Sequence, residues 1–371
     1  MQPRRGRGIH RVPPQGGTHG GIDYSELKRL GISPQDVTDF SVSINPFGPP
    51  PGIAEAIARA PLDRYPDSES TDLREELAKR LAISPERLFI GSGSTEIIRL
   101  LAIACFAPQE RVIIPEPTYG DYEVACHLAG VRTIKASMLG EAGFRTNVPR
   151  LVGLVREYVP EGLFLCNPNN PTGQYLPEQD VRTIAYEAGR GLVVLDEAYI
   201  GLTAGAWDST GLIDMGNLVS VRSMTKDYAL AGLRLGYAIA PEAVISALRS
   251  VRPPWNVSSV AQAAGLFALG ADAYLEECGR RLREARGFLM EGLAGLGLAP
   301  LPSRANFFLV RVGDATGFRS ALLTRGIIVR DCTSFGLPDY IRLAPRTIPD
   351  CARLLDAIRE ALRTRGGEHA P

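Results

Sequence analysis

Short apolar segments alternate with amphipathic ones over residues 111–195, and this alternation constrains the fold more than any other feature of the sequence. The apolar segments have the length of strands, and the segments between them have helical spacing. We expect strands at residues 111–115, 131–136, 163–166 and 192–195, with helices at 119–129, 148–158 and 178–189. Strands linked in this way form a mostly parallel sheet with helices on both faces, so the chain is predicted to be an α/β protein.

Polar and aromatic residues stand where three of these strands end. Tyr119 follows the first strand, the sequence NPNNPTG with Asn170 follows the third, and Asp196 follows the fourth with Tyr199 three residues later. Because ligands collect at the carboxyl ends of parallel strands, these residues predict a binding site. Each also has an ordinary structural use: the tyrosine could fill a core, the asparagine could make a turn and Asp196 could cap a helix.

The segment Ser223-Met224-Thr225-Lys226 follows an apolar strand at residues 218–221, and Arg234 comes eight residues after the lysine. Two hydroxyls and a guanidinium predict a site for a small anion with an amine beside it. Such an amine can form a Schiff base with an aldehyde, and burial and nearby cations can lower its pKa. Taken alone, the pattern also fits a solvated loop after a strand.

A glycine- and serine-rich turn, GSGSTE at residues 91–96, joins an apolar strand to a helix over residues 97–106. The free backbone N–H groups and the dipole of a helix N-terminus attract anions, and Ser94 and Thr95 can add hydroxyls. No Gly-Lys-Ser/Thr follows, so this is not a Walker loop. The turn predicts an anion-binding cup, with a plain helix cap as the alternative.

Charge and composition exclude several classes of partner. The 371 residues include 41 Lys+Arg and 41 Asp+Glu, so the net charge is zero, and no apolar run approaches the length of a membrane span. We therefore expect neither nucleic acid nor a membrane as a partner. The six cysteines have no CxxC spacing and the four histidines are scattered, so we expect no disulfide framework, no metal site and a cytoplasmic location.

The N-terminal segment is expected to contribute little regular structure. Residues 1–18 are basic and rich in Pro and Gly without an apolar core, which predicts a flexible tail and not a secretory signal. His19 follows within GGTHGG, which is either an anion contact or a hinge. Asn45 stands where a short extended piece ends, which suits either a turn or a ligand contact.

The sequence RPPWNV at residues 252–257 is a rigid break, and we expect it to begin a smaller α+β domain. The predicted organisation is an N-terminal arm at 19–50, a large domain at 51–251 and a small domain at 252–371, with the arm belonging to the small domain. In the last part we expect helices at 259–269, 273–282, 286–296, 316–325 and 350–363, and strands at 306–312, 327–330 and 340–343. Its arginines exceed what a core needs and predict an anionic substrate; they are Arg304, Arg330, Arg342 and Arg346.

A buried carboxylate, an amine, an aromatic plane and an anion cup on one sheet edge are what pyridoxal 5′-phosphate requires, since the acid keeps the ring nitrogen protonated. With the motifs NPNNPTG, DEAY and SMTK followed by GLRLGY, the chain resembles the fold-type I pyridoxal-phosphate enzymes of the class I/II aminotransferase superfamily. The resemblance runs from about His19 to the final helix.

The resemblance implies a role for each of these residues. Lys226 would bind the cofactor's aldehyde, Asp196 would pair with the ring nitrogen, and Tyr119 would stack on the ring. Tyr199 and Asn170 would contact the phenolic oxygen. The phosphate would be held by Ser94, Thr95, Ser223, Thr225 and Arg234. The resemblance further implies that Arg342 takes the substrate's α-carboxylate, and that Tyr65 reaches the cofactor phosphate of a neighbouring subunit in a homodimer.

Two families within the superfamily compete. RYPD at residues 64–67, PTY at 117–119 and the lysine motif resemble the histidinol-phosphate aminotransferases. The segments HGG at 19–21, DFS at 39–41, INPFGP at 44–49, PW at 254–255, RDC at 330–332 and YIR at 340–342 resemble the threonine-phosphate decarboxylases of cobalamin biosynthesis.

From these segments we expect a decarboxylase that converts O-phospho-L-threonine to (R)-1-aminopropan-2-yl phosphate and carbon dioxide. The alternative is an aminotransferase such as histidinol-phosphate aminotransferase, and a more remote one is a non-catalytic regulator that binds pyridoxal phosphate. In either enzyme the substrate is a small phosphorylated amino acid or amine. The residues expected around its phosphate are His19, Asn45, Arg330 and Arg346.

Overall fold

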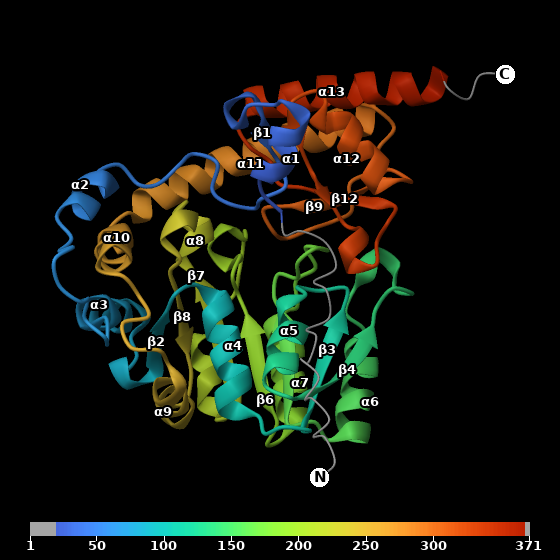
Figure 1. The fold of residues 1–371 in the computed structure, drawn as a ribbon. Helices are drawn as coiled ribbons and strands as arrows, with labels where there is room; N and C mark the ends of the chain where they lie inside the picture. Colours follow the sequence, from blue (N-terminus) through green and yellow to red (C-terminus); the bar gives the residue numbers. More distant parts are fainter. Residues whose placement is uncertain (1–19, 368–371) are drawn as a thin grey trace, which may run out of the picture.

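A seven-stranded sheet forms the centre of the protein in a computed structural model that describes residues 20–367 (Figure 1). The strands lie in the order β2-β8-β7-β6-β5-β3-β4, and all run parallel except β8, which is antiparallel to both neighbours. Their bounds are β2 (Leu88–Gly91), β3 (Arg111–Glu116), β4 (Arg132–Ser137), β5 (Gly162–Cys166), β6 (Leu192–Asp196), β7 (Leu218–Ser223) and β8 (Gly236–Ile239). The prediction of an α/β protein with a mostly parallel sheet is confirmed.

Alternate residues of the strands face two different layers of helices. On β3, Val112 and Ile114 pack in a core with α4, α5 and α9, whereas Ile113 packs in a second core with α6 and α7. Both faces are buried, which is why these strands are continuous apolar runs in the sequence. The helices are α4 (Ser94–Cys105), α5 (Asp121–Leu128), α9 (Glu242–Val251), α6 (Val148–Tyr158) and α7 (Glu178–Ala188).

A third core closes the end of the sheet that contains β2 and β8. Leu73 and Leu77 of α3 pack there with Leu88 of β2 and with Leu235, which precedes β8. Gly265 lies where α10 crosses this core, and a Cβ at that position would collide with the Leu235 side chain. The elements that build this end are α2 (Ile53–Ala58), α3 (Thr71–Leu81), α10 (Ser259–Leu269) and the short helix α8 (Met224–Asp227) after β7.

The C-terminal part has a sheet of its own, which lies above the seven-stranded sheet in Figure 1. Its three strands are antiparallel in the order β11-β12-β9, and Phe308, Phe318 and Leu354 fill the core between this sheet and its helices. The bounds are β9 (Phe308–Arg311), β11 (Arg330–Asp331), β12 (Tyr340–Leu343), α11 (Asp272–Gly295), α12 (Ala315–Leu323) and α13 (Ile348–Gly367).

One expected break is absent. The two helices predicted at residues 273–282 and 286–296 are a single helix, α11. We expected a break between residues 282 and 286. The sequence there contains no proline and no capping residue, so nothing interrupts the helical hydrogen bonds.

The N-terminal arm lies against the C-terminal part. After α1 (Tyr24–Leu30), β1 (Thr38–Asp39) pairs in parallel with β10 (Ile327–Ile328), and Phe40 is fully buried in the core of the C-terminal sheet. The predicted domain boundaries stay a prediction. The tail at residues 1–18 and His19 lie outside the described residues.

Over residues 20–367, no helix combines the length and the apolar character that crossing a bilayer would need. The cytoplasmic location stays a prediction.

Candidate active site

The ends of several strands meet at one edge of the seven-stranded sheet, and the residues around them line a cavity. β7 ends at this edge and antiparallel β8 begins there, so Ser223 lies opposite Gly236, while Cys166 of β5 lies beside Asp196 of β6. The cavity is lined by Ser94, Thr95, Tyr119, Cys166, Asn170, Asp196, Ala198, Tyr199, Thr225, Lys226 and Arg234. The structure therefore brings the residues predicted for cofactor binding together, apart from Ser223 just behind the lining and Tyr65.

Asp196 ends β6 with a buried carboxylate. Its Oδ2 accepts a hydrogen bond of 2.6 Å from the hydroxyl of Tyr122, and its Oδ1 accepts one of 3.0 Å from the backbone N–H of Ala198. Burial raises the pKa of Asp196 to about 6, although both hydrogen bonds favour the ionised form. The carboxylate is therefore ionised at neutral pH, inside a pocket where it can stabilise a positive group.

Lys226 lies on α8 and faces the same cavity. Burial, followed by the charges of Arg342 and Arg234, lowers its pKa to about 8, whereas the charge of Asp196 acts in the opposite direction. Its Nζ is 5.8 Å from the centre of the Tyr199 ring. An amine with a pKa close to neutral can act both as a nucleophile and as a base.

The backbone around Lys226 is fixed on two sides. The hydroxyl of Ser223 lies 2.6 Å from that of Thr225 and accepts a hydrogen bond from the Thr225 N–H. From the N-terminal arm, the N–H of Asn45 donates to the Lys226 carbonyl at 2.8 Å, and its side-chain amide donates to the Asp227 carbonyl at 2.9 Å. Asn45 thus braces the helix that bears the lysine; its predicted contact with a substrate phosphate stays a prediction.

The N-terminus of α4 forms a cup for an anion. Ser94 and Thr95 stand in its first turn, where backbone N–H groups point out of the helix. Gly93 has φ +83°, and a Cβ there would lie 2.7 Å from Nη2 of Arg234, so only glycine lets the guanidinium approach the turn. Hydroxyls, free N–H groups and a guanidinium in one place suit a phosphate.

Tyr119 and Tyr199 stand on two sides of the cavity. The hydroxyl of Tyr119 is 3.1 Å from the Thr95 hydroxyl, and its ring meets the Tyr122 ring edge-on at 5.5 Å. The ring of Tyr199 meets Phe307 edge-on at 4.9 Å. Both rings are therefore held by their neighbours before any ligand binds.

Arg342 links the C-terminal sheet to the cavity. It is buried, donates a hydrogen bond to the side-chain oxygen of Asn170, donates another of 2.6 Å to the Ser41 carbonyl and lies over the Phe307 ring. Its Nε is also buried and has no hydrogen-bond partner among the described residues. Its guanidinium is thus held on both terminal nitrogens by neighbouring residues.

The other predicted arginines lie elsewhere. Arg330 on β11 lies opposite Arg342 in the register of β11 with β12. Its side chain donates a hydrogen bond of 2.7 Å to Ser334 and lines a second cavity. Arg346 bonds Asp350 and the Asp39 carbonyl. Arg304 donates to the Ala204 carbonyl at 2.6 Å and lies over the Tyr175 ring. The predicted contacts of Arg330 and Arg346 with a substrate phosphate stay predictions.

Tyr65 lies outside the cavity. Its side chain is 74% exposed and stacks on Trp255, with 4.1 Å between the ring centres. His19 lies outside the described residues, so its predicted contact with a substrate phosphate also stays a prediction.

Two residues of the site were missed in the sequence. Tyr122 contacts Asp196, and its only signal was its place in the first turn of α5, three residues after Tyr119. Cys166 lines the cavity as the last residue of β5, a position that the rule on strand ends would have selected.

The residues present fit pyridoxal 5′-phosphate. Asp196 is a buried acid for a ring nitrogen and Lys226 an amine for an aldehyde. The glycine-lined cup at α4 suits a phosphate.

Comparison with known proteins points the same way. The family described as Aminotransferase class I and II matches residues 35–358. The chain is 36% identical to the histidinol-phosphate aminotransferase of Symbiobacterium thermophilum, over 90% of this chain and 92% of that protein. It is 34% identical to histidinol-phosphate aminotransferase 1 of Thiobacillus denitrificans, over 94% of this chain and 92% of that protein.

Solved structures share the fold. The histidinol-phosphate aminotransferase from Sinorhizobium meliloti, in complex with pyridoxal-5′-phosphate, superimposes with a TM-score of 0.85 at 27% identity, over 96% of this chain and 98% of that chain. The Thermus thermophilus aspartate aminotransferase with maleate gives a TM-score of 0.79 at 26% identity, over 91% of this chain and 94% of that chain. The prediction of the fold-type I architecture is confirmed.

The predicted decarboxylation of O-phospho-L-threonine is wrong. The relatives are histidinol-phosphate aminotransferases at 32–36% identity over most of the chain. In three of the segments that favoured the decarboxylase, the residues make structural contacts: Asn45 braces α8, Phe40 fills a core and Trp255 stacks on Tyr65. Such contacts do not determine which substrate bond breaks.

Proposed function

The chain belongs to the class I and II aminotransferases, and from that premise we propose that it transfers the amino group of histidinol phosphate to 2-oxoglutarate. The observation that supports this substrate is the 36% identity to a histidinol-phosphate aminotransferase over 90% of the chain. The cofactor is pyridoxal 5′-phosphate. Pyridoxal phosphate supplies an electron-accepting ring that stabilises negative charge at the carbon bearing the substrate's amino group.

We propose that the cavity residues hold this cofactor by its ring nitrogen, its aldehyde, one face of its ring, its phenolic oxygen and its phosphate. Asp196 would hold the ring nitrogen, Lys226 the aldehyde carbon and Tyr119 one face of the ring. Tyr199 and Asn170 would contact the phenolic oxygen. The phosphate would be held by Ser94, Thr95, Ser223, Thr225 and Arg234. Their support is their common place on the cavity and around the turn at α4.

Lys226 would move the proton in transamination. With a pKa of about 8 it is partly neutral at physiological pH, so it can accept a proton from the substrate carbon and return it to a different atom. The ionised Asp196 would keep a positive charge on the ring nitrogen throughout, since it is buried and holds two hydrogen bonds. Arg342 would bind the carboxylate of 2-oxoglutarate through its guanidinium.

We further propose a homodimer. Tyr65 and Trp255 form a stacked pair on the surface, 74% and 46% exposed, and Leu62 nearby in sequence is 82% exposed. Large apolar side chains exposed together are typical of an interaction surface. A second copy of the chain would cover them and receive Tyr65 at its own cofactor phosphate.

One assay tests the proposed activity. The purified protein with pyridoxal phosphate is incubated with histidinol phosphate and 2-oxoglutarate, and glutamate is measured; O-phospho-L-threonine is supplied in a parallel reaction. We expect glutamate from histidinol phosphate and no carbon dioxide from O-phospho-L-threonine. If aspartate supports glutamate formation at a far higher kcat/KM than histidinol phosphate does, the proposed substrate is wrong although the family holds.

A further inference from the structure

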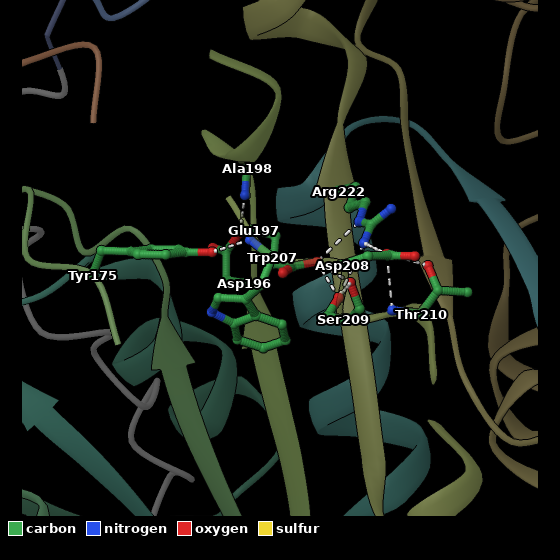
Figure 2. A network of polar contacts seen from close by, with 10 residues as sticks. Tyr175, Asp196, Glu197, Ala198, Trp207, Asp208, Ser209, Thr210 and Arg222 are labelled. Carbon is green, nitrogen blue, oxygen red and sulfur yellow. Dashed lines mark hydrogen bonds and ion pairs between the residues drawn. The ribbon is translucent and has the colours of Figure 1, made fainter. Parts of the chain in front are cut away.

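A buried ion pair lies behind the active site, on the two strands that present its acid and its amine. Glu197 directly follows Asp196 at the end of β6, and Arg222 precedes the Ser223–Lys226 segment on β7. The Nε of Arg222 donates to Oε2 of Glu197 at 2.9 Å, and the Glu197 side chain is fully buried. Figure 2 shows this pair together with the loop around Ser209.

The two oxygens of the Glu197 carboxylate differ in the number of hydrogen bonds that they accept. Its Oε2 accepts three hydrogen bonds, from Arg222 and from the hydroxyls of Ser209 and Ser220, both at 2.6 Å. Its Oε1 is buried and has no hydrogen-bond partner among the described residues. Arg222 reaches further and donates to Asp208 at 3.1 Å.

Stability alone is a poor reason for this arrangement. Taking two charges out of water costs about as much as their attraction returns, and a well-packed apolar pair of the same size often stabilises a fold more. An unpartnered buried oxygen adds to the cost. Buried polar pairs are instead suited to fixing one arrangement of the elements that bear them.

The elements fixed here are those that must present the two cofactor groups. Asp196 lies opposite Val221 in the β6–β7 register, and the backbone N–H of Glu197 donates to the Val221 carbonyl at 2.8 Å. The side-chain pair adds a second connection between the same two strand ends. A shift of β7 relative to β6 would therefore move Lys226 away from Asp196 and break both connections.

We propose that Glu197 and Arg222 are positioning residues that set the placement and the charge balance of Asp196 and Lys226 for the bound cofactor. The inference rests on the cofactor site of the proposed function and not on its substrate. Neither residue lines the cavity, so each acts through its neighbours.

The opposite charges of Glu197 and Arg222 should have opposite effects on Asp196, which can be measured. Glu197 is a second carboxylate next to Asp196 and raises the pKa of Asp196, and Arg222 compensates that charge. The titratable groups that face the pair from neighbouring segments are Tyr175, Asp208, Asp227 and Tyr237. Removing Glu197 leaves Arg222 with the exposed Asp208 as its acidic partner, whereas removing Arg222 leaves the buried Glu197 carboxylate without its cation, so the change in charge has opposite sign in the two cases.

The test compares E197Q and R222Q as holoenzymes. The absorbance of bound pyridoxal phosphate is followed against pH, and its Kd and the thermal midpoint of the protein are measured. In both variants we expect the Kd to rise roughly 10- to 100-fold, as for other residues that orient ligand-binding groups. The pH midpoint of the absorbance should fall in E197Q and rise in R222Q, because the remaining charges are opposite.

Three further variants complete the design. R222K keeps the charge and should restore the pH midpoint to near that of the wild type. D208N removes a partner of Arg222 that is 72% exposed and should leave the Kd of pyridoxal phosphate within about twofold. If E197Q or R222Q does not fold, S209A removes a single donor to Glu197 and should still raise the Kd severalfold.

The outcomes are distinct. Variants that melt at lower temperature but keep the wild-type Kd and pH midpoint would show that the pair only stabilises the fold, and the proposal would fall. Midpoints that shift in the same direction in E197Q and R222Q would also overturn it. Because these readouts need only the cofactor, a failure to form glutamate from histidinol phosphate would leave this test intact.

Discussion

Tyr122 on α5 donates a 2.6 Å hydrogen bond to the buried carboxylate of Asp196. The tyrosine is itself fully buried, stacked on Phe164 with 4.9 Å between ring centres, so its hydroxyl has little freedom to turn elsewhere. The acid is thus held by a donor that the rest of the core keeps in place. The ionised form of Asp196 depends on this bond, because burial favours the neutral form.

Replacing this donor should shift the acid side of the pH profile. In Y122F the ionised form of Asp196 loses a hydrogen bond, so its pKa should rise from about 6. A hydrogen bond to a charged group contributes roughly 1.5 to 3 kcal/mol, which corresponds to about one to two pKa units. We expect the acid limb of kcat/KM, and the pH midpoint of the cofactor absorbance, to move to higher pH by about that amount.

Y119F is the matched control for this prediction. It removes a hydroxyl from the neighbouring ring, but that hydroxyl contacts Thr95 and not Asp196. We expect Y119F to leave the acid limb where it is, even if cofactor affinity falls. An acid limb that is unchanged in Y122F, or that moves to lower pH, would contradict the role assigned to the tyrosine.

Arg342 should matter most for the carboxylate substrate. In R342K the side chain keeps its charge but loses the planar fork that donates to Asn170 and the Ser41 carbonyl. We expect the KM for 2-oxoglutarate to rise about 10- to 100-fold, with a smaller change in kcat. Steady-state kinetics with histidinol phosphate held saturating measures both constants.

R311K is a suitable control for that experiment. Arg311 lies on the adjacent strand β9 of the same sheet, and its ion pair with Asp339 is on the surface. The KM for 2-oxoglutarate should be unchanged in this variant. Equal effects of R311K and R342K would mean that the sheet, and not the fork of Arg342, is responsible.

Asp227 should make the stability of the protein depend on pH. Burial raises its pKa to about 7, and its Oδ1 is buried without a hydrogen-bond partner among the described residues. The folded protein therefore retains a proton that the unfolded chain releases near pH 4, so stability falls as the pH rises from about 4 to 7. D227N removes this dependence because the amide is neutral at every pH.

D227N should accordingly be more stable than the wild type above pH 7, by roughly 4 kcal/mol at most, and nearly equal to it near pH 4. Urea denaturation at a series of pH values gives the comparison. D208N is the control with the opposite sign: hydrogen bonds from Thr210 and Arg222 outweigh burial and lower the pKa of Asp208, so its substitution should reduce stability at neutral pH. A D227N variant that is less stable at pH 8 would contradict the prediction.

The sheet and most of the cavity could be predicted because the same pattern specifies both. A strand such as β6, buried along its whole length, is a continuous apolar run, and its last residue falls at the ligand edge. The direction of β8 could not be predicted, since Gly236–Ile239 is equally apolar whether it runs parallel or antiparallel.

Residues that act through contacts between distant segments were harder to assign. Nothing in the sequence around Arg346 shows that it bonds a carbonyl of the N-terminal arm, or that Asn45 braces α8. In the sequence, Tyr122 looks like any residue on the apolar face of a helix, and only the fold shows that Asp196 lies beside it. The choice between decarboxylase and aminotransferase failed for a related reason, because three of the segments used to make it contain residues with structural contacts, namely Phe40, Asn45 and Trp255.

The proposed dimer predicts that two inactive variants restore each other. K226A lacks the amine at its own cavity, and Y65A lacks the exposed ring that would reach the partner's cofactor phosphate. In a mixed dimer the Y65A protomer keeps Lys226 and receives Tyr65 from the K226A protomer, so its site is complete. The site of the K226A protomer is not, and the mixed dimer therefore has one complete site of two. The unselected mixture from co-expression should therefore have about a quarter of wild-type activity if protomers pair at random, and mixed dimers isolated through two affinity tags should have about half, whereas each variant alone stays low. If the co-expressed pair is no more active than the sum of the separate variants, or if Y65A alone binds pyridoxal phosphate and turns over like the wild type, Tyr65 does not act across a dimer interface.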